Sequence, residues 1–288
     1  MSLFRRKLMM ISGKRIDYSL YAIHVKKNPE VMAVVYAKGW SASPDFMTFE
    51  EAAAVTNAQF ETAFLANKNI KHFEEFKYFT GITAIGRIKT GSFAGFYNCT
   101  NLSVIELPPT LKRLSYQSFR ASGIVSIYIP DSVNEANAGR SSWLANSGAF
   151  YGCSKLETVR YSGNLLYVTS VMFTNCVKLR EINNMDNVTR IGGRAFMGCR
   201  SLTEFTIPAG VTGIGIGVGT SNTYTGEAFS GCTGLENIIC LPDTPPTLGG
   251  TNNFYNTTCT ISVPAESVES YKSAPGWVDI ADRIIAIS

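Results

Sequence analysis

The sequence predicts a mainly β fold with short helices: a solenoid of about seven coils of 23 residues, with a helical cap before it and a second cap after it. Three observations lead to this prediction. A motif of Phe, Cys and Leu returns at a fixed period along the chain. Each copy is followed by a short alternation of apolar and polar residues, which is the pattern of a strand with one buried face. The segments on either side of the repeats show helix signals instead.

The repeat is anchored by the motif Phe-x-x-Cys-x-x-Leu, whose copies begin at Phe96, Phe150, Phe173, Phe196 and Phe229. A sixth copy at Phe119 lacks the cysteine, and an incomplete seventh copy begins at Phe254. The steps from one Phe to the next are 23, 31, 23, 23, 33 and 25 residues, so the unit has 23 residues and two coils carry insertions. A single unit of this size cannot bury its apolar face alone, and we therefore expect the copies to stack as a solenoid over residues 82–264.

The repeat resembles that of the BspA-type leucine-rich repeat proteins, which are bacterial surface antigens. The resemblance rests on the stretch AFMGCRSLTEFTIPAGVTGIG, residues 195–215, and on its other copies. Residues 48–56, 73–85 and 263–287 are similar to flanking stretches of that family as well. The resemblance implies a leucine-rich-repeat solenoid, a role in adhesion or binding, and no catalytic residues.

Composition argues against two classes of partner. Residues 1–16 contain five basic residues and no acidic one; without them the 26 basic residues of the chain fall to 21, against 22 acidic residues. The remaining chain is nearly neutral and lacks the clustered basic residues that a nucleic-acid groove needs. No run approaches the 18 or so apolar residues of a membrane span, so neither nucleic acid nor a membrane span is expected.

The cysteines are predicted to be core residues. Five of the seven occupy the same repeat position, where stacked coils place them in parallel about 5 Å apart. Their side chains then point the same way, which is poor geometry for disulfides. Only two histidines exist and neither lies near a cysteine pair, so we predict no metal site and no cofactor.

Residues 1–16 are interpreted as a basic N-terminal arm that is a candidate docking segment for a partner. Their apolar run, Leu8–Ile11, is shorter than the roughly 7–15 residues of a secretory signal. The expected place of action therefore has two alternatives. One is an extracellular or cell-surface location, which the resemblance implies and which a truncated sequence would reconcile with the missing signal. The other is a phage virion that carries the same repeat fold.

Residues 17–81 are interpreted as a helical N-terminal cap. Thr48 followed by Glu51 forms a capping-box pattern, which predicts a helix over residues 50–55. Two further short helices are predicted over residues 59–65 and 73–78.

Two other terminal features complete the division of the chain. The apolar run over residues 31–37 fits either a strand or a short helix. The loop that follows it offers only Asp45 as a carboxylate, so we interpret it as a degenerate calcium-type loop. Residues 265–288 are interpreted as the C-terminal cap, with a helix over residues 265–273 and a strand-like segment over residues 279–287.

Four candidate ligand-binding residues lie on the predicted strands. Aligning the copies places Tyr128, Arg160 and Asn183 at the same outward position of neighbouring strands, with Glu181 at the other outward position. Aromatic and arginine side chains dominate the binding energy of many interfaces. The alternatives are that this face is only solvated, and that Tyr128 and Arg160 merely stack on each other.

Two insertions supply the other candidates. One spans about residues 132–148 and contains Arg140 and Trp143; the other spans about residues 213–227 and contains Tyr224. Both follow the strand of their coil, so we expect them to leave the same side of the solenoid, where insertions often carry binding. The glycine-rich second insertion lacks the context of a phosphate loop, and no nucleotide site is predicted.

The sequence thus favours a non-catalytic binding protein with a protein or glycan ligand on a cell surface. An enzyme is the competing hypothesis. His24 and His72 both lie in the predicted cap, away from any candidate nucleophile. Glu181 and Glu204 on adjacent coils resemble a glycosidase acid pair, but an open sheet face offers no pocket for a substrate.

Overall fold

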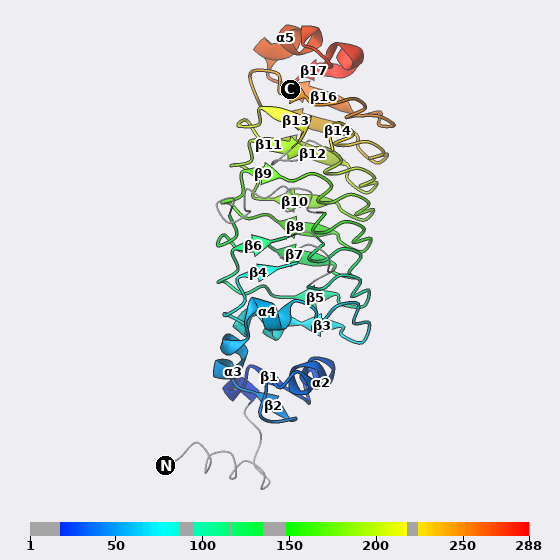
Figure 1. The fold of residues 1–288 in the computed structure, drawn as a ribbon. Helices are drawn as coiled ribbons and strands as arrows, with labels where there is room; N and C mark the ends of the chain where they lie inside the picture. The colour runs from blue at the N-terminus through cyan, green and yellow to red at the C-terminus, as the bar shows by residue number, and fades with distance from the viewer. Residues whose placement is uncertain (1–17, 87–94, 116, 135–147, 218–223, 288) are drawn as a thin grey trace.

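The computed structural model describes residues 18–86, 95–115, 117–134, 148–217 and 224–287, and predictions about other residues lie outside this part of the chain. The structure is an elongated solenoid with a helical cap at one end and a second cap at the other (Figure 1). The mainly β repeat fold predicted from the sequence is therefore confirmed.

The described coils contribute strands to two columns, and every assigned pair within both columns is parallel. The first column comprises β3 (His72–Phe73), β5 (Val104–Ile105), β7 (Ser126–Tyr128), β8 (Thr158–Arg160), β10 (Glu181–Asn183), β12 (Glu204–Ile207), β14 (Asn237–Cys240), β16 (Thr260–Val263) and β17 (Ile284–Ala286). The second comprises β4 (Ala84–Ile85), β6 (Arg113–Leu114), β9 (Tyr167–Val168), β11 (Arg190–Gly192), β13 (Gly213–Ile216) and β15 (Thr247–Leu248). The sequence predicted only the first column, whose outward side we call the strand face.

The Phe residues that open the seven coils stack into a single buried column. Neighbouring ring centroids lie 5.2–5.9 Å apart and neighbouring ring planes are 4–14° from parallel. The column includes Phe119 and Phe254, so the two incomplete copies of the motif form coils like the others. We call the part of each coil around this Phe the turn side.

The turn side requires a left-handed backbone conformation two residues after each Phe. This position has a φ between 54° and 75° in all seven coils, at Asn98, Ala121, Gly152, Asn175, Gly198, Gly231 and Asn256. Glycine and asparagine adopt this conformation more readily than other residues. The need explains why Gly or Asn precedes every repeat cysteine in the sequence.

Each repeat cysteine also joins two coils. The thiols of Cys153, Cys176, Cys199 and Cys232 each donate to the carbonyl of the Phe that opens the preceding coil, at Sγ–O distances of 3.0–3.2 Å. All seven cysteines are buried and free, as the sequence predicted for the repeat position. Burial raises the pKa of the Cys153 thiol to about 12, so the neutral donor form is held at ordinary pH.

One coil precedes the copies that the motif identifies. Phe64, Asn67 and Ile70 occupy the places of Phe, Cys and Leu, and the carbonyl of Phe64 accepts the thiol of Cys99 at 3.0 Å. The strand of this coil, β3, pairs in parallel with β5. The stacking of coils therefore begins inside the segment that we assign to the cap from sequence.

The N-terminal cap contains helical and antiparallel elements. The apolar run over residues 31–37, for which the sequence allowed a strand or a helix, lies in a helix, α2 (Pro29–Ala37). Strand β1 (Ile23–His24) pairs antiparallel with β2 (Phe46–Met47). The predicted capping box is confirmed, since Thr48 and Glu51 exchange both hydrogen bonds at the start of α3 (Phe49–Ala54). The third predicted helix is a 3-10 helix, η2 (Glu74–Tyr78).

The helix predicted over residues 59–65 is wrong in extent, because α4 (Asn57–Phe60) ends where the chain turns to bury Phe64. The rings of Phe60, Phe64 and Phe76 lie 5.3–5.7 Å from that of Phe96 and close this end of the Phe column. A short 3-10 helix, η1 (Tyr18–Leu20), precedes these elements.

The C-terminal cap closes the other end of the column with tryptophan. The ring of Trp277 lies 5.7 Å from that of Phe254, and its indole N–H donates to the carbonyl of Pro246 at 2.8 Å. The predicted helix over residues 265–273 is present as η4 (Ala265–Ser267) and α5 (Val268–Ser273). The strand-like prediction for residues 279–287 is wrong in its first half, where η5 (Val278–Arg283) precedes β17.

The second insertion is shorter than predicted. Residues 213–216, which we assigned to it, form strand β13 and pair with β11 and β15. Arg140 and Trp143 of the first insertion lie outside the described residues.

Candidate functional site

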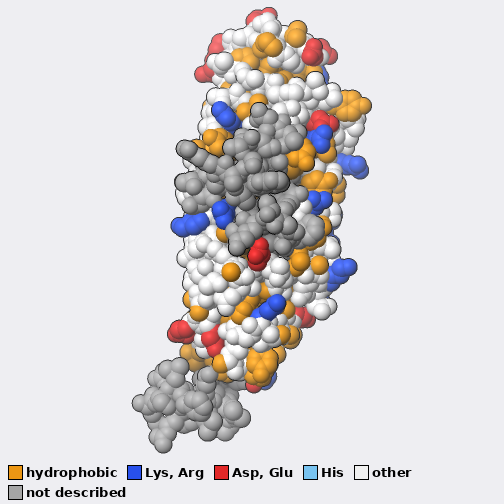
Figure 2. Space-filling model, viewed as in Figure 1, with side chains coloured by type: hydrophobic (Ala, Val, Ile, Leu, Met, Phe, Trp, Pro, Cys, Tyr) orange, Lys and Arg blue, Asp and Glu red, His pale blue; other side chains and the backbone are white. Residues whose placement is uncertain are grey.

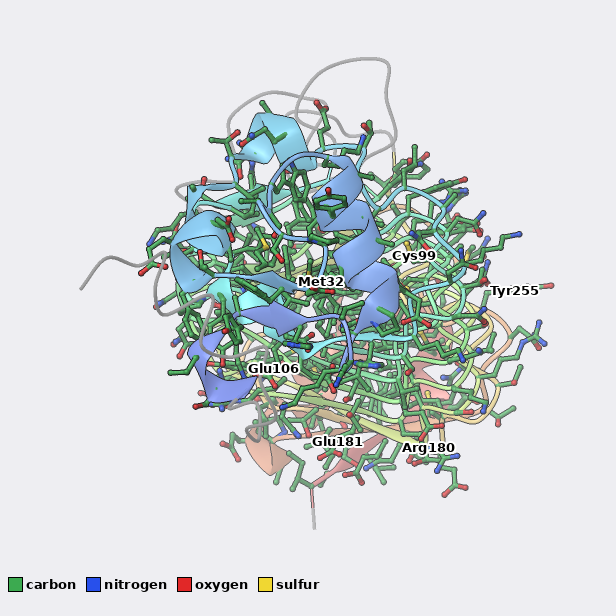
Figure 3. The ribbon with its side chains drawn as sticks, turned by 90° about the horizontal axis from the view of Figure 1, so that it is seen from below. Met32, Cys99, Glu106, Arg180, Glu181 and Tyr255 are labelled. Atoms are coloured by element: carbon green, nitrogen blue, oxygen red, sulfur yellow. The ribbon has the colours of Figure 1, made fainter. Side chains whose placement is uncertain are left out.

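The strand face brings four of the predicted ligand-binding residues together. Tyr128, Arg160 and Asn183 are in register across β7, β8 and β10, so they form one row across three strands. The side chains of all three are exposed, Tyr128 to 47%, which is high for a tyrosine on a sheet. Glu181 lies at the other outward position of β10, and its carboxylate accepts from the amide of Asn183 at 2.8 Å. Viewed along the solenoid, Arg180 and Glu181 project on this side (Figure 3).

The aromatic and the cation of this row contact each other. The guanidinium of Arg160 lies 4.8 Å from the ring centroid of Tyr128, which is a cation–π distance. The stacking that we considered as an alternative from sequence is therefore present. Both residues remain exposed, so the stacked pair stays accessible from solvent.

A groove lies at the end of the row. Strands β10 and β12 belong to adjacent coils but do not pair, so the first column is interrupted here. The groove between them has a volume of about 550 Å³ and is lined by Glu181, Asn183 and Asp186 from one coil and by Glu204 and Thr206 from the next. We had expected Glu181 and Glu204 to lie on neighbouring paired strands; that pairing is wrong.

Two residues explain the interruption. Asn184 stands where the neighbouring coils carry the buried residues Tyr161 and Ile207, and it has a left-handed φ of 65°. Its amide donates to the carbonyl of Tyr161 at 2.8 Å, so the chain turns away after Asn183, and β10 lacks a fourth residue that would match Ile207 of β12. In the next coil Phe205 replaces the Ile or Val found at the equivalent position of β7, β8 and β10, and its larger ring lies 4.9 Å from that of Phe196.

Charge on the described surface is dispersed. In Figure 2 the lysine and arginine side chains are scattered singly over the body of the solenoid instead of forming one continuous basic area. On the strand face the ammonium of Lys77 donates to the carboxylate of Glu106 at 2.8 Å, and this hydrogen bond raises the pKa of Lys77. This distribution suits a recognition surface with mixed polarity better than a surface for a polyanion.

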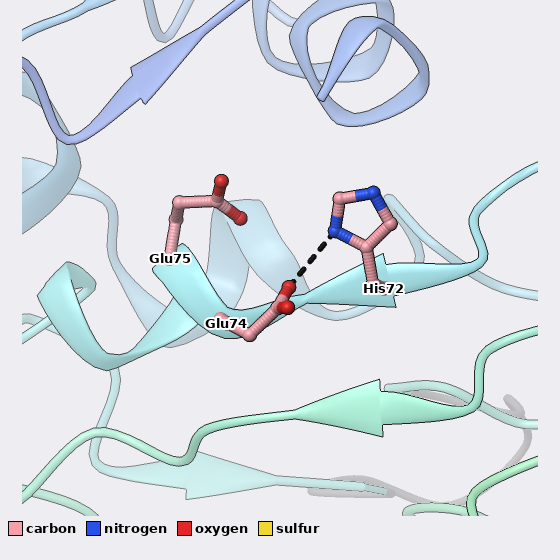
Figure 4. Close-up of side chains that lie close together, drawn as sticks. All are labelled: His72, Glu74 and Glu75. Atoms are coloured by element: carbon pink, nitrogen blue, oxygen red, sulfur yellow. Dashed lines mark hydrogen bonds and ion pairs between the residues drawn. The ribbon is translucent and has the colours of Figure 1, made fainter. Parts of the chain in front are cut away.

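One group of the N-terminal cap has the composition of a metal site. His72, Glu74 and Glu75 offer ligand atoms that all lie within 4.8 Å of one another (Figure 4). All three already have partners: His72 and Glu74 pair with each other at 2.8 Å, and Glu75 accepts from the buried amide of Asn28 at 3.0 Å. Sequence reasoning missed this group because it looked for histidines beside cysteines. These bonds give all three residues a structural role in joining β3, η2 and α2.

The turn side holds the last described candidate. The guanidinium of Arg194 lies 5.5 Å from the ring centroid of Tyr224, and its Nε is paired with the carboxylate of Glu227 at 2.5 Å. Tyr224 is remote in the sequence from the strand-face candidates and lies on a different part of the coil. The predicted residues therefore fall into two groups, one on the strand face and one on the turn side.

Two solved structures of leucine-rich repeat proteins are similar to this chain. The structure is similar to that of a leucine-rich repeat protein from Bacteroides ovatus, with 23% identity, a TM-score of 0.45, and coverage of 77% of this chain and 58% of that one. It is also similar to a leucine rich cell surface protein from Faecalibacterium prausnitzii, with 21% identity, a TM-score of 0.41, and coverage of 68% and 59%. This chain thus spans less than two thirds of the length of either structure, and the likeness concerns the fold alone.

Other comparisons address sequence. No curated protein matches the chain. Among the helices that the structure describes, none has the length and apolar character needed to cross a bilayer. The model of the BspA type leucine rich repeat region matches residues 47–140 and 145–238, with six copies of the repeat. These two ranges make up more than half of the sequence, and they contain the five complete copies of the Phe-x-x-Cys-x-x-Leu motif, from Phe96 to Leu235. The chain therefore belongs to the BspA-type leucine-rich repeat family.

Proposed function

We propose that the protein is a non-catalytic binding protein that recognises a protein or glycan ligand through its strand face. One observation supports this most directly: the exposed row of Tyr128, Arg160 and Asn183 runs in register across three strands and ends at an open groove. Such a row offers an aromatic face, a guanidinium and an amide within a few ångströms of one another. These are the groups that bury large area and fix hydrogen bonds in protein and glycan recognition.

The groove adds polar partners to the row. Glu181, Asp186 and Glu204 place carboxylates along it, and Thr206 contributes a hydroxyl. Carboxylates and amides accept and donate hydrogen bonds to sugar hydroxyls or to a peptide backbone. The ligand surface that we infer is therefore polar, with at least one apolar or planar group to cover Tyr128.

The place of action that we propose is a bacterial cell surface, which the family resemblance implies. The alternative from sequence, attachment to a phage particle, uses the same face. Fractionation of the source cells distinguishes them: the protein pellets with envelope fragments in the first case and with purified particles in the second.

The binding proposal is tested with a double variant. Tyr128→Ala with Arg160→Ala removes the centre of the row but no buried contact, so we expect an unchanged melting temperature. Attachment to the glycans or host proteins that the wild type retains on an array is expected to fall tenfold or more.

A matched control exists in the same chain. Tyr167 and Arg190 form an equivalent pair on β9 and β11, in register and with the guanidinium 5.9 Å from the ring centroid. Replacing that pair by alanine should leave attachment unchanged. Equal attachment by the wild type and by the folded Tyr128/Arg160 variant would rule out the strand face as the binding site.

A further inference from the structure

A small hollow lies on the turn side, away from the strand face. Its volume is about 230 Å³, and it is lined by residues from the coils that begin at Phe119, Phe150, Phe173 and Phe196, together with Tyr224. It is smaller than the clefts of about 300–1,000 Å³ that take drug-sized ligands, and it suits a single small ring or anion.

The hollow arises because small residues occupy two positions that recur in every coil. One is the position directly after the Phe that opens the coil, and the other is two positions before that Phe. In the middle coils these positions are taken by Gly148, Val171 and Thr174, which are small and buried. The middle coils therefore leave a gap at these two positions, where the flanking coils carry longer side chains.

Arginine and tyrosine lie at both ends of this gap. At one end the guanidinium of Arg120 is 4.4 Å from the ring centroid of Tyr151, and at the other end Arg194 faces Tyr224 at 5.5 Å. Both arginines are half-buried, and both rings hold the guanidinium groups in place by cation–π contact. Such fixed, partly desolvated guanidiniums are effective donors to oxyanions.

The charge balance of the described lining is positive. Arg120 and Arg194 line the hollow, and no Asp or Glu is among the described residues that line it. Glu227 neutralises part of Arg194 by pairing with its Nε, which leaves the terminal nitrogens of that guanidinium for another acceptor. Among the described residues no carboxylate pairs with Arg120.

The position of the hollow links it to both departures from the 23-residue repeat. Gly148 is the last residue of the first insertion, and Tyr224 lies near the end of the second. Both of these residues line the hollow. The chain therefore returns to the solenoid beside the hollow after both insertions, which make up the 31- and 33-residue steps of the repeat.

We propose that this turn-side hollow, formed by Arg120, Tyr151, Thr174, Arg194 and Tyr224 with their small neighbours, binds an anionic sugar unit. The carboxylate or phosphate of the ligand accepts from the two arginines, which bind such groups in a bidentate way. The apolar edges of the tyrosine rings border the sugar ring, and the size of the hollow limits recognition to one unit. Because the hollow and the strand face share no residue, this inference stands or falls separately from the proposed function.

The test is a titration of the whole purified chain, followed by nuclear magnetic resonance or calorimetry, with four probes: glucuronate, N-acetylneuraminate, glucose 6-phosphate and glucose. We expect saturable binding of one or more of the anionic sugars and none of glucose. Binding should weaken as salt rises, because it depends on charge. Preference for the acids or for the phosphate tells which oxyanion the hollow takes.

Arg120→Gln is the main variant, because among the described residues Arg120 has no ion pair that its loss would disrupt. It should weaken anion binding at least tenfold at an unchanged melting temperature. Arg190→Gln, on β11 and outside both the hollow and the strand face, is the matched control and should bind as the wild type does. Arg160→Gln is measured beside it to report on the strand face. Arg194→Gln serves as a second variant, with circular dichroism to confirm its fold.

Three results would overturn the proposal. They are an absence of binding by every anionic probe at millimolar concentration, equal binding of glucose, and undiminished binding by folded Arg120→Gln. Loss of binding in Arg160→Gln but not in Arg120→Gln would move the anion site to the strand face.

Discussion

The turn side and the strand face follow opposite rules along the same solenoid. On the turn side the coils repeat the same contacts. Each Phe of the column stacks on the next Phe. A cysteine thiol also donates to the Phe carbonyl of the preceding coil at five places: Cys99, Cys153, Cys176, Cys199 and Cys232. On the strand face the outward residues change from coil to coil, and pairing stops between β5 and β7 and again between β10 and β12.

The contrast shows where each coil is constrained. On the turn side, each buried side chain packs against the equivalent side chain of the coils before and after it. The same residue type therefore recurs at that position from coil to coil. On the strand face only the inward residues are packed, and the outward ones are free to differ. Function is therefore expected where the columns lose their regularity: at the groove of the strand face and at the small-residue gap of the turn side.

The largest expected effect comes from breaking the Phe column. Phe173→Ala removes a fully buried ring between Phe150 and Phe196 and leaves a cavity, which should lower the free energy of unfolding by about 3–5 kcal/mol. Urea denaturation followed by circular dichroism measures this loss.

The control for that variant is Tyr255→Ala, which lies at the position after Phe254 and is 66% exposed. It should change stability by less than about 0.5 kcal/mol. A loss below about 1 kcal/mol in Phe173→Ala would mean that the column does not carry the stability of the solenoid.

The second effect concerns the residue that interrupts the strand face. Asn184→Ala loses the hydrogen bond from the side-chain amide to the carbonyl of Tyr161 and puts alanine, which tolerates left-handed backbone less well than asparagine, at a φ of 65°, so it should lower stability by about 1–3 kcal/mol. Asn184→Gly loses the same hydrogen bond but removes the strain, and should be the more stable of the two. If glycine is no better than alanine at this position in thermal melts, the backbone there does not hold the left-handed turn that ends β10.

The third effect depends on pH and tests the cysteine column. Burial raises the pKa of Cys153 from 9.0 to about 12, so above pH 9 the thiol ionises in the unfolded chain but not in the folded one. Its contribution to stability is therefore complete below pH 9 and is lost between pH 9 and 12, at about 1.4 kcal/mol per pH unit.

The contribution of the Cys153 thiol to the pH dependence of stability is isolated by comparing the wild type with Cys153→Ala. Cys153→Ala should be less stable than the wild type at pH 7.5, and the gap in urea midpoint should narrow as pH rises to 10.5. A constant gap over this range would show that the thiol titrates alike in the folded and unfolded chains.

Much of the fold was predictable because stacked coils need the same kinds of residue at the same positions, and this requirement is visible as a repeat in the sequence. The Phe, Cys and Leu positions recur since each must match its neighbour, and the Gly or Asn before each cysteine follows from the left-handed turn. The earlier coil at Phe64 was missed because Asn67 and Ile70 replace the two residues that the motif requires.

The candidate sites were predictable only in part. The row of Tyr128, Arg160 and Asn183 follows directly from aligning the copies, since register is fixed by the repeat. The groove was not, because its cause is a pair of substitutions, Asn184 and Phe205, whose effect depends on packing between two coils. The turn-side hollow likewise results from small residues in separate coils, and no single stretch of sequence reveals it.

The smallest expected effect separates stacking from recognition on the strand face. Tyr128 and Arg160 are exposed, and their cation–π contact at 4.8 Å should contribute less than about 1 kcal/mol to stability. A double-mutant cycle with Tyr128→Ala, Arg160→Ala and the combined variant measures this coupling in urea denaturation. The same four proteins, assayed for attachment, should show a much larger effect, because a ligand that contacts both side chains loses its contacts with both. A coupling well above 1 kcal/mol in the free protein, with no change in attachment, would assign the pair to stability and remove it from the binding surface.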